Sequence, residues 1–332
     1  MFSIVIPTKD RPKDLAELLL TVLKQSYRPF EVIIVDDSQT SSIKEVSDSF
    51  KSKFESISCN LRYVAGSGDG LTASRNLGIA IFHGDVLFFL DDDTILEQSV
   101  LNKLARFLRN HPDSMGVQPV ILRDTKKINR SSIVEKLKNA IYKVLMLSYS
   151  DENKLNVRRS GASVFPSAMT KIITAQRLSG CCCCYRREVF YEFSFDTNLK
   201  KYGLLEDLDF SYRVHKKYPR SLYVIPYTTI IHKISKEARL PTKTVIYMST
   251  IYWFYIFFKD IFEGSILNLI AFLWALTGNL IAHTGGLIIK RKSKREWWSL
   301  IYVFKSYITA LNYLRNIIMQ DLEFFNETLK KV

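Results

Sequence analysis

Three consecutive aspartates, Asp91, Asp92 and Asp93, follow the apolar run Val86–Leu90. The run predicts a buried strand, and three carboxylates at its end cannot be buried without partners. Because side chains two residues apart on an extended backbone point to the same side, Asp91 and Asp93 can face one point while Asp92 faces away. Carboxylate oxygens at that spacing suit Mg2+ or Mn2+, which can also hold phosphate oxygens. The alternative is an acidic strand end that caps the next helix.

A second acidic group, the pair Asp36 and Asp37, follows the strand pattern at 31–35. Paired acids there could bind a metal or accept hydrogen bonds from a base or ribose. A glycine-rich stretch, 66–71, follows a later strand pattern and resembles a dinucleotide-binding loop. That pattern fails because Leu71 stands where its third glycine should be, but the loop can still bring backbone N–H groups close to an anion.

A third acidic group contains Glu206, Asp207 and Asp209. Arg213 lies four residues after Asp209, which predicts a routine surface pair on a helix. Asp207 is not explained in this way. A carboxylate near a helix N-terminus is favoured in its ionised form, so Asp207 could serve as a general base.

The elements that must position these acids alternate along the first hundred residues. Strand patterns at 2–7, 31–35, 61–64 and 86–90 alternate with helical patterns at 14–25, 42–53 and 71–81. This order favours a parallel sheet with helices on both faces. Ligands of such sheets bind beyond the carboxyl ends of the strands, where each of the first two acidic groups lies.

Composition limits the class of protein. The chain has 332 residues, 47% hydrophobic, which is enough for one large or two ordinary domains. Its net charge of +14 suits anionic partners such as a membrane surface or phosphorylated substrates. No dense Lys/Arg tract with interleaved aromatics opens the chain, so we expect no nucleic acid partner. The start has no signal-peptide pattern, so we expect the N-terminal part in the cytoplasm.

The five cysteines are Cys59 and the run 181–184. Four adjacent thiols in an unsecreted chain do not predict a disulfide framework. Cys181 and Cys184 form C-x-x-C, but no second pair completes a zinc site. The favoured interpretation is a buried strand.

Residues 123–160 resemble a basic helical insertion. One helical face carries Ile133, Leu137, Ile141, Val144 and Leu145, with lysines mostly elsewhere. Such a helix packs on the domain or lies on a membrane, and packing is favoured.

The composition changes after residue 240. An apolar run at 244–258 precedes a run without Asp, Glu, Lys or Arg at 265–289, which is long enough to span a bilayer. Basic residues at 290–295 and the pair Trp297-Trp298 follow, which is typical of a cytoplasmic interface. A re-entrant or interfacial hairpin, a two-pass anchor and a buried helical pair in a soluble protein remain open.

Taken in order, the motifs resemble the inverting glycosyltransferases of family 2, over roughly residues 2–235. The residues that carry the resemblance are Ile4-Val5-Ile6-Pro7-Thr8 with Asp10-Arg11, Val35-Asp36-Asp37-Ser38, Ala73-Ser74-Arg75-Asn76-Leu77-Gly78, Leu90-Asp91-Asp92-Asp93, Glu206-Asp207 and His232. The resemblance implies the α/β GT-A fold with a mixed, mostly parallel sheet. It implies a nucleotide-binding half at 1–120 and an acceptor-side half at 165–235, followed by a hydrophobic helical region at 240–332.

The resemblance also implies roles for particular residues. Donor binding falls to Pro7, Thr8, Asp10, Asp36, Asp37, Arg75, Asn76, Asp91 and Asp92, with Arg75 beside the base. Asp91, Asp93 and His232 would hold Mn2+ or Mg2+. Asp207, with Glu206, would be the catalytic base, and Gly180 would lie on the acceptor side. Asp92 is the member of its triplet that we expect to tolerate substitution best.

The family's processive synthases carry a Q-x-x-R-W motif, which Lys294-Arg295-Glu296-Trp297-Trp298 does not match. We therefore expect single sugar additions from a nucleotide-sugar donor to a glycan or lipid-linked acceptor at the cytoplasmic face of the cell membrane. A nucleotidyltransferase on a related fold and a non-catalytic sugar-nucleotide-binding membrane protein are the alternatives.

Overall fold

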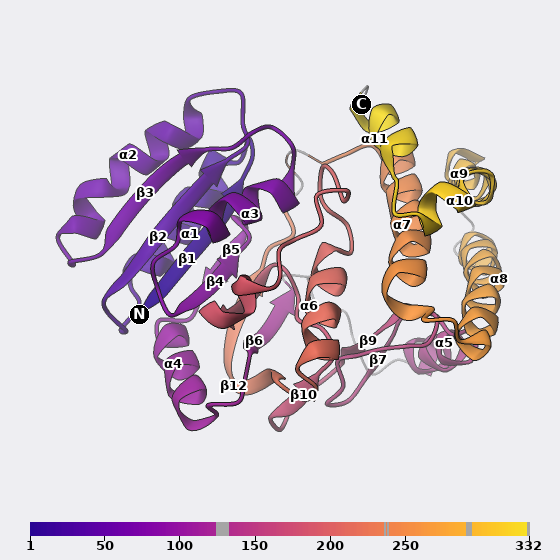
Figure 1. The fold of residues 1–332 in the computed structure, drawn as a ribbon, viewed down its shortest axis with the longest axis horizontal. Coiled ribbons are helices and arrows are strands. Elements are labelled where there is room, and N and C mark those ends of the chain that lie inside the picture. Colours follow the sequence, from indigo (N-terminus) through magenta and orange to yellow (C-terminus); the bar gives the residue numbers. More distant parts are fainter. Residues whose placement is uncertain (124–132, 236, 238, 290–293, 331–332) are drawn as a thin grey trace. The chain divides into compact units, whose positions relative to one another are not determined.

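The computed structural model describes residues 1–123, 133–235, 237, 239–289 and 294–330 (Figure 1). The chain divides into two compact units, and each is described by itself. Unit 1 comprises Met1–Lys127 and Met169–Arg239, and unit 2 comprises Ile128–Ala168 and Leu240–Val332. Most of the expected insertion, 123–160, therefore groups with the C-terminal helices, whereas the sequence had suggested that it belongs to the catalytic domain.

Unit 1 is built on a nine-stranded sheet of spatial order β10-β12-β6-β11-β4-β1-β2-β3, with β5 paired to β12, among the residues described. The strands are β1 (Phe2–Thr8), β2 (Phe30–Asp36), β3 (Asn60–Ala65), β4 (Val86–Leu90), β5 (Thr94–Leu96), β6 (Gly116–Arg123), β10 (Ile173–Ala175), β11 (Cys182–Arg186) and β12 (Leu222–His232). Only β5, β10 and β11 run against the other strands. The sheet is mixed and mostly parallel, as expected.

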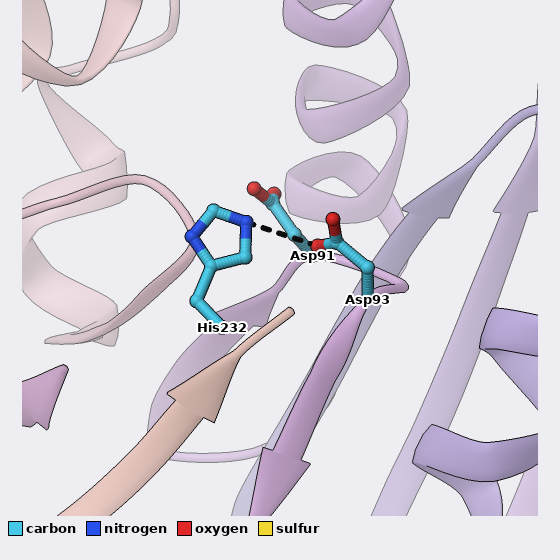
Figure 2. A group of neighbouring side chains, drawn as sticks. All are labelled: Asp91, Asp93 and His232. Atoms are coloured by element: carbon cyan, nitrogen blue, oxygen red, sulfur yellow. Dashed lines mark ion pairs between the residues drawn. The ribbon is translucent and has the colours of Figure 1, made fainter. Parts of the chain in front are cut away.

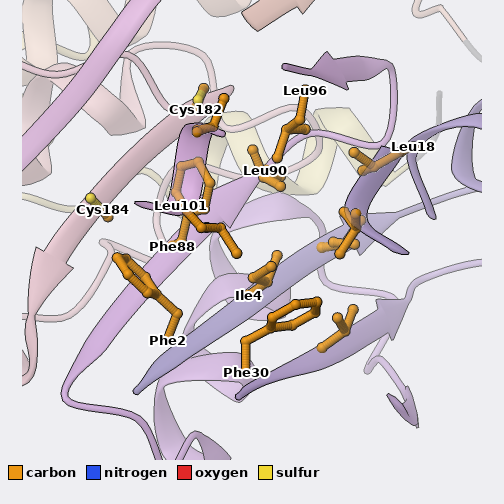
Figure 3. Packing of buried hydrophobic residues seen from close by; sticks show 14 of the residues in the cluster. Phe2, Ile4, Leu18, Phe30, Phe88, Leu90, Leu96, Leu101, Cys182 and Cys184 are labelled. Atoms are coloured by element: carbon orange, nitrogen blue, oxygen red, sulfur yellow. The ribbon is translucent and has the colours of Figure 1, made fainter. Parts of the chain in front are cut away.

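Helices cover both faces of this sheet. They are α1 (Pro12–Leu23), α2 (Ser42–Glu55), α3 (Leu71–Ile81), α4 (Val100–Asn110), α6 (Glu206–Lys217) and the short 3-10 helix Arg187–Tyr191. Alternation along the strands sends Ile4 and Phe88 to one face, in a cluster with residues of α1, α2 and α4 (Figure 3). On the other face, Phe89 meets Phe195, which stacks on Phe210 of α6 at 4.3 Å.

The cysteine run forms part of this core. Cys182, Cys183 and Cys184 lie in β11, which pairs with β4 and β6, and all five cysteines are buried and free. The interpretation as a buried strand is confirmed. Burial raises the pKa of the Cys182, Cys183 and Cys184 thiols well above the usual range, so these three thiols are poor nucleophiles.

Unit 2 contains a small sheet of order β7-β9-β8 and a group of helices. Its elements are β7 (Tyr149–Asp151), β8 (Asn156–Val157), β9 (Ser163–Pro166), α5 (Ile133–Val144), α7 (Thr242–Ile256) with the π-helical turn Phe257–Ile261, α8 (Ile266–Ile289), α9 (Lys294–Asn312), α10 (Leu314–Ile318) and α11 (Glu323–Lys330). Helix α7, the shorter of the two apolar runs, is largely buried. Within the described residues, α8 alone is long and apolar enough to cross a membrane, and 22% of that stretch is buried.

The apolar face of α5 corrects one expectation. Ile133, Leu137, Ile141 and Val144 are 83%, 60%, 45% and 69% exposed, and only Leu145, just beyond the helix, is buried. Within unit 2 most of this face is therefore uncovered, whereas the sequence favoured a packed face. Periodicity shows that a helix has an apolar face but does not show what covers it.

Candidate active site

The site lies at the carboxyl ends of the parallel strands. β1 ends at Thr8, which pairs with Asp36 at the end of β2. Asp91 follows the last residue of β4, and its backbone N–H donates to the carbonyl oxygen of Cys181 (3.1 Å). The parallel sheet thus brings the acidic groups of separate strands to one edge.

Asp91, Asp93 and His232 form one cluster (Figure 2). One possible ligand atom from each residue lies within 4.8 Å of the others, and His232 Nε2 lies 3.0 Å from Asp93 Oδ1. His232 reaches the acids because β12 pairs with β5, placing His232 opposite Thr94. Two carboxylates and an imidazole fit Mn2+ or Mg2+, so the donor set suits the implied cation.

The charges in this cluster stabilise each other. Burial opposes ionisation, but the hydrogen bond and charge of His232 lower the pKa of Asp93 to about 2. Likewise, burial disfavours the imidazolium, but Asp93 raises the pKa of His232 to about 10. A metal ion would therefore have to displace a proton from His232, because only neutral imidazole is a ligand.

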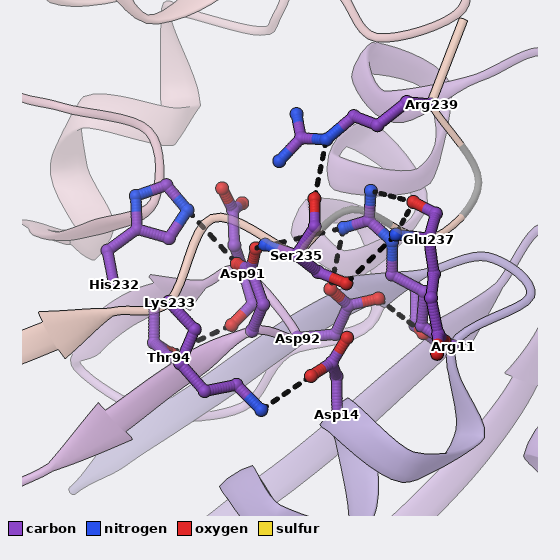
Figure 4. Close-up of polar contacts among 12 residues, drawn as sticks. Arg11, Asp14, Asp91, Asp92, Thr94, His232, Lys233, Ser235, Glu237 and Arg239 are labelled. Atoms are coloured by element: carbon purple, nitrogen blue, oxygen red, sulfur yellow. Dashed lines mark hydrogen bonds and ion pairs between the residues drawn. The ribbon is translucent and has the colours of Figure 1, made fainter. Parts of the chain in front are cut away.

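Asp92 points away from the cluster, and its carboxylate has buried partners of its own. It is 4% exposed, it accepts a hydrogen bond from Thr8 Oγ1 (2.8 Å), and it pairs with Arg11 Nη1 (3.1 Å; Figure 4). Burial raises the pKa of Asp92 to about 7, against the opposing charge of Arg11. Replacing a carboxylate held in this way leaves Thr8 and Arg11 without a partner, so these contacts argue against the expected tolerance.

Arg11 and the backbone after β12 form a second layer beside the aspartates (Figure 4). Arg11 Nε and Nη2 donate to the carbonyl oxygen of Glu237 (3.2 and 3.0 Å). The N–H of Ser235 donates to Asp93 Oδ2 (2.8 Å), and the N–H of Lys233 donates to the Asp93 carbonyl (3.0 Å). The motif Asp10-Arg11 marked this position in the sequence, but its partner at Glu237 could not be inferred.

Arg75 lies in a buried network of ion pairs and hydrogen bonds. It is 1% exposed, forms an ion pair with Glu206, and donates through Nη2 to Asp91 Oδ1 (3.2 Å) and the Gly180 carbonyl (3.0 Å). Its guanidinium also lies over Phe195. Arg75 therefore links the end of β4 to the start of α6, and this arrangement fits a residue that positions two carboxylates better than one beside a base.

Gly180 faces this buried pair. A Cβ atom at this position would lie 2.5 Å from Glu206 Oε1 and 2.8 Å from Arg75 Nη2, so any other residue here would have to displace the buried pair. Burial raises the pKa of Glu206 to about 7, although the charge of Arg75 opposes the rise. The Glu206 carboxyl is thus closed off from solvent and paired with Arg75.

Asp207 lies in the first turn of α6 and is held from two sides. Its Oδ2 accepts hydrogen bonds from Arg177 Nη2 (2.6 Å) and from the Gly180 N–H (3.1 Å). No motif in the sequence indicated Arg177. Asp209 does pair with Arg213 (2.6 Å), but Asp209 is fully buried, so the prediction of a surface pair was wrong.

The oxygens of Asp36 and Asp37 are engaged within unit 1. Asp36 accepts from the Ser38 N–H and from the Tyr63 hydroxyl, both at 2.9 Å. Asp37 accepts from two backbone N–H groups of the glycine loop 66–70, at 2.8 and 3.0 Å. These bonds fix the loop at the strand ends.

The other residues that were expected to bind the donor are Pro7, Thr8, Asp10 and Asn76, and their environments differ from one another. Pro7 and Thr8 are buried in β1, and Asp10 is exposed with a φ of +55°. The Asn76 side chain donates to the Phe195 carbonyl and accepts from the Phe195 N–H, both at 2.8 Å. Asn76 therefore holds a loop of the fold, and its amide is occupied there.

Comparison with known proteins gives a consistent result. The sequence model of glycosyl transferase family 2 matches residues 3–193. Glycosyltransferase GlyG of Streptococcus pneumoniae is 28% identical over 104 residues, 31% of this chain and 34% of GlyG. The poly(ribitol-phosphate) beta-N-acetylglucosaminyltransferase TarS of Staphylococcus aureus is 26% identical over 112 residues, 33% of this chain and 19% of TarS. The glucosyl-dolichyl phosphate glucuronosyltransferase of Haloferax volcanii is 29% identical over 125 residues, 37% of this chain and 38% of that protein. The matches thus span about a fifth to two fifths of these relatives.

Solved structures share the GT-A fold. The crystal structure of S. aureus TarS 1–349 superposes with a TM-score of 0.55 at 18% identity, covering 99% of this chain and 91% of that one. The mannosyltransferase PcManGT from Pyrobaculum calidifontis, in complex with GDP-Man and Mn2+, gives 0.54 at 15% identity, covering 93% and 86%.

Proposed function

Because the chain belongs to glycosyl transferase family 2, we propose that it moves one sugar from a nucleotide diphosphate sugar to an acceptor hydroxyl, with inversion. The observation that carries this proposal is the connection made by Arg75. This one buried side chain contacts both Asp91 of the acidic cluster and Glu206 beside Asp207. The groups proposed for donor binding and for proton transfer are thereby held in a fixed relation.

The proposed donor site is at the ends of β1, β2 and β4. Asp91, Asp93 and His232 would hold Mn2+ or Mg2+, which when bound supplies positive charge against the diphosphate. Thr8, Asp36 and the loop ordered by Asp37 border the same strand ends. PcManGT was solved with GDP-Man and Mn2+, which supports this assignment.

The proposed base is Asp207. Arg177 and Gly180 hold one carboxylate oxygen, which orients the group. Asp207 takes the proton of the acceptor hydroxyl while that oxygen bonds to the anomeric carbon. The bond to the nucleotide diphosphate breaks on the opposite side, so one displacement inverts the configuration.

The Asp207→Asn variant tests this assignment. We expect transfer to fall by about 10²–10⁴-fold, because the amide cannot accept the proton, while donor affinity measured by calorimetry stays unchanged. Glu192→Gln, on an exposed side chain of the same unit, is the control and should retain activity. Wild-type turnover in Asp207→Asn would remove Asp207 from the role.

A donor screen tests the reaction class. UDP-, GDP- and dTDP-sugars are incubated with Mn2+ and with Mg2+, and we expect release of nucleotide from one of them. Ala substitution of Asp91 and Asp93 should remove the metal-dependent part of donor affinity. Pyrophosphate release from a nucleoside triphosphate would instead identify a nucleotidyltransferase, and donor binding without turnover a non-catalytic protein.

The proposed acceptor is a lipid-linked glycan at the cytoplasmic face of the cell membrane. The net charge of +14 and the apolar helix α8 support it. The name of the Haloferax volcanii relative describes transfer to a sugar on dolichyl phosphate. Detergent-free, monodisperse solubility of the full chain would count against this location.

A further inference from the structure

Helix α8 has two distinct faces. Phe272 and Ala275 are buried against other helices of unit 2, and Phe272 stacks on Phe257 at 3.9 Å. The opposite stripe is 46 to 64% exposed and consists of Ile266, Ile270, Leu273, Trp274, Ile281 and Ile288. Their spacing places them along one side of the helix, so α8 presents an uncovered apolar stripe that the exposed Thr277 interrupts.

Polar side chains of these helices lie between them. Asn279 Nδ2 of α8 donates to the Tyr307 hydroxyl of α9 (2.9 Å), and His283 Nε2 lies 2.9 Å from Ser299 Oγ. These polar contacts lie between the helices, whereas the outer side of α8 carries exposed aliphatic side chains. This arrangement is typical of helices whose outer side faces lipid.

Two neighbouring helices extend the apolar area. The end of α5 is fastened to α8, because Trp274 Nε1 donates to the Val144 carbonyl (2.9 Å) and Leu145 packs with Ala275. The uncovered face of α5 was described above. On α9, a stripe of side chains is also exposed, namely Trp298, Ile301, Phe304, Ile308 and Leu311. We call these three stripes the outer apolar surface of unit 2.

Positive charge accompanies this surface. Lys136, Lys138 and Lys143 on α5 are exposed. Residues 240–332 contain 11 Lys and Arg against 6 Asp and Glu, and residues 128–168 contain seven against three. Apolar stripes accompanied by cations complement the acyl boundary and the phosphate groups of an anionic membrane.

We propose that α5, α8 and α9 lie in the interface of an anionic phospholipid membrane, with the outer apolar surface at the acyl boundary and no helix crossing the bilayer. Crossing is disfavoured because α9 is bonded to α8 at both Asn279 and His283 and would have to cross with it. That would carry the exposed Lys305 of α9 into the hydrocarbon. The inference rests on the proposed membrane location but not on the proposed chemistry.

Vesicle sedimentation of the full chain tests whether the outer apolar surface binds the membrane. We expect binding to phosphatidylglycerol-containing vesicles, and a loss of about tenfold or more for the triple variant Ile270→Gln, Leu273→Gln, Ile281→Gln. These side chains are exposed, so the fold should be retained. The matched control replaces Leu20, Tyr191 and Tyr227, exposed apolar residues of unit 1, with Gln and should bind like the wild type. Equal loss in both variants, or none in either, would overturn the proposal.

A second variant tests whether the lysines of α5 contribute to membrane binding. Lys136→Gln, Lys138→Gln, Lys143→Gln should weaken binding to anionic vesicles by about tenfold or more, and salt should have the same effect. The matched control replaces Lys44, Lys51 and Lys53 on α2. Unchanged binding of the α5 variant would contradict an anionic partner.

Depth measurements separate an interfacial helix from a crossing one. Nitroxide labels are attached to Ile266→Cys, Leu273→Cys, Ile281→Cys and Ile288→Cys, and labelling is selective because the native cysteines are buried. If α8 lies in the interface, the four labels should report the same shallow depth. Depth that passes through the bilayer centre would show a crossing helix. A dimer in solution that the Gln triple variant abolishes, without vesicle binding, would assign the surface to a second copy of this chain.

Donor hydrolysis in solution distinguishes this inference from the proposed function. A chain that binds vesicles but turns over no donor would reject the proposed function and leave the surface supported. A chain that turns over donor while the Gln triple variant binds vesicles like the wild type would reject the surface alone.

Discussion

In unit 1 the buried Arg75 contacts two carboxylates and a carbonyl, whereas in unit 2 helix α8 leaves Leu273 53% exposed to solvent. In unit 1, charged side chains are buried and form ion pairs with each other. Unit 2 packs polar contacts between helices and leaves aliphatic side chains outside. Both arrangements are costly in a protein that only has to fold in water.

In each unit, this contrast identifies a feature that lowers the stability of the fold in water and that we connect with function. A buried ion-pair network fixes the geometry of carboxylates in unit 1, although apolar residues would pack there at lower cost. An uncovered apolar stripe in unit 2 gains its stabilisation only when a partner covers it. All four tryptophans, at 253, 274, 297 and 298, are in unit 2, so their fluorescence reports on that unit separately.

Removing Arg75 should have the largest effect on stability. Arg75→Met leaves Glu206 and Asp91 without their buried partner, and we expect a loss of about 4 kcal/mol in the free energy of unfolding. Urea unfolding followed by circular dichroism measures it, while tryptophan fluorescence should show little change in unit 2. The double variant Arg75→Met, Glu206→Gln should recover part of the loss. A loss below about 1 kcal/mol would mean that the network is not structural.

Adjacent residues on α8 provide the matching test in unit 2. Phe272→Ala should cost about 3 kcal/mol because it empties a stacked position that is 1% exposed. Leu273→Ala, one residue further, should change stability by less than about 0.5 kcal/mol. Tryptophan fluorescence in urea compares the two. Similar costs would show that the stripe is covered in solution.

Substitutions of Asp92 test how much its hydrogen bonds to Thr8 and Arg11 stabilise unit 1. Asp92→Ala should cost about 1–3 kcal/mol, because Thr8 and Arg11 lose a buried partner. Asp92→Asn should cost less, since an amide oxygen can still accept from Thr8. If both variants unfold like the wild type, Asp92 is the tolerant spacer that the motif alone suggested.

The smallest effect concerns Glu31, which pairs with Ser3 and His83. Burial opposes its ionisation, but these hydrogen bonds lower the pKa of Glu31. A carboxyl whose pKa is lower in the folded state stabilises the fold at pH values above its unfolded-state pKa. This stabilisation is lost as the pH falls through the folded-state pKa. Glu31→Gln should therefore cost about 1 kcal/mol at neutral pH, and the difference should shrink below about pH 4.5 in urea titrations. A difference independent of pH would assign the effect to packing.

Much of the fold was accessible from the sequence. The predicted helix at 71–81 and strand at 86–90 have the bounds of α3 and β4, because apolar periodicity is a local property of neighbouring residues. The order of strands and helices also predicted that Asp36 and Asp91 lie at one edge of a parallel sheet. The family motifs named His232 as a partner of Asp91 and Asp93, and the structure places the three together.

The remaining assignments depended on partners far apart in the chain. Arg75 joins Glu206, Arg177 joins Asp207, and Asp92 joins Arg11, and no spacing rule connects such pairs. The α5 face shows the same limit, since its periodicity predicted an apolar stripe but not its exposure. The helices, the strands and the acids at their ends could be predicted from the sequence, because both follow from nearby residues. Which charges are buried together, and which apolar faces of a unit stay uncovered, depends on the packing of distant segments and is visible only in the folded chain.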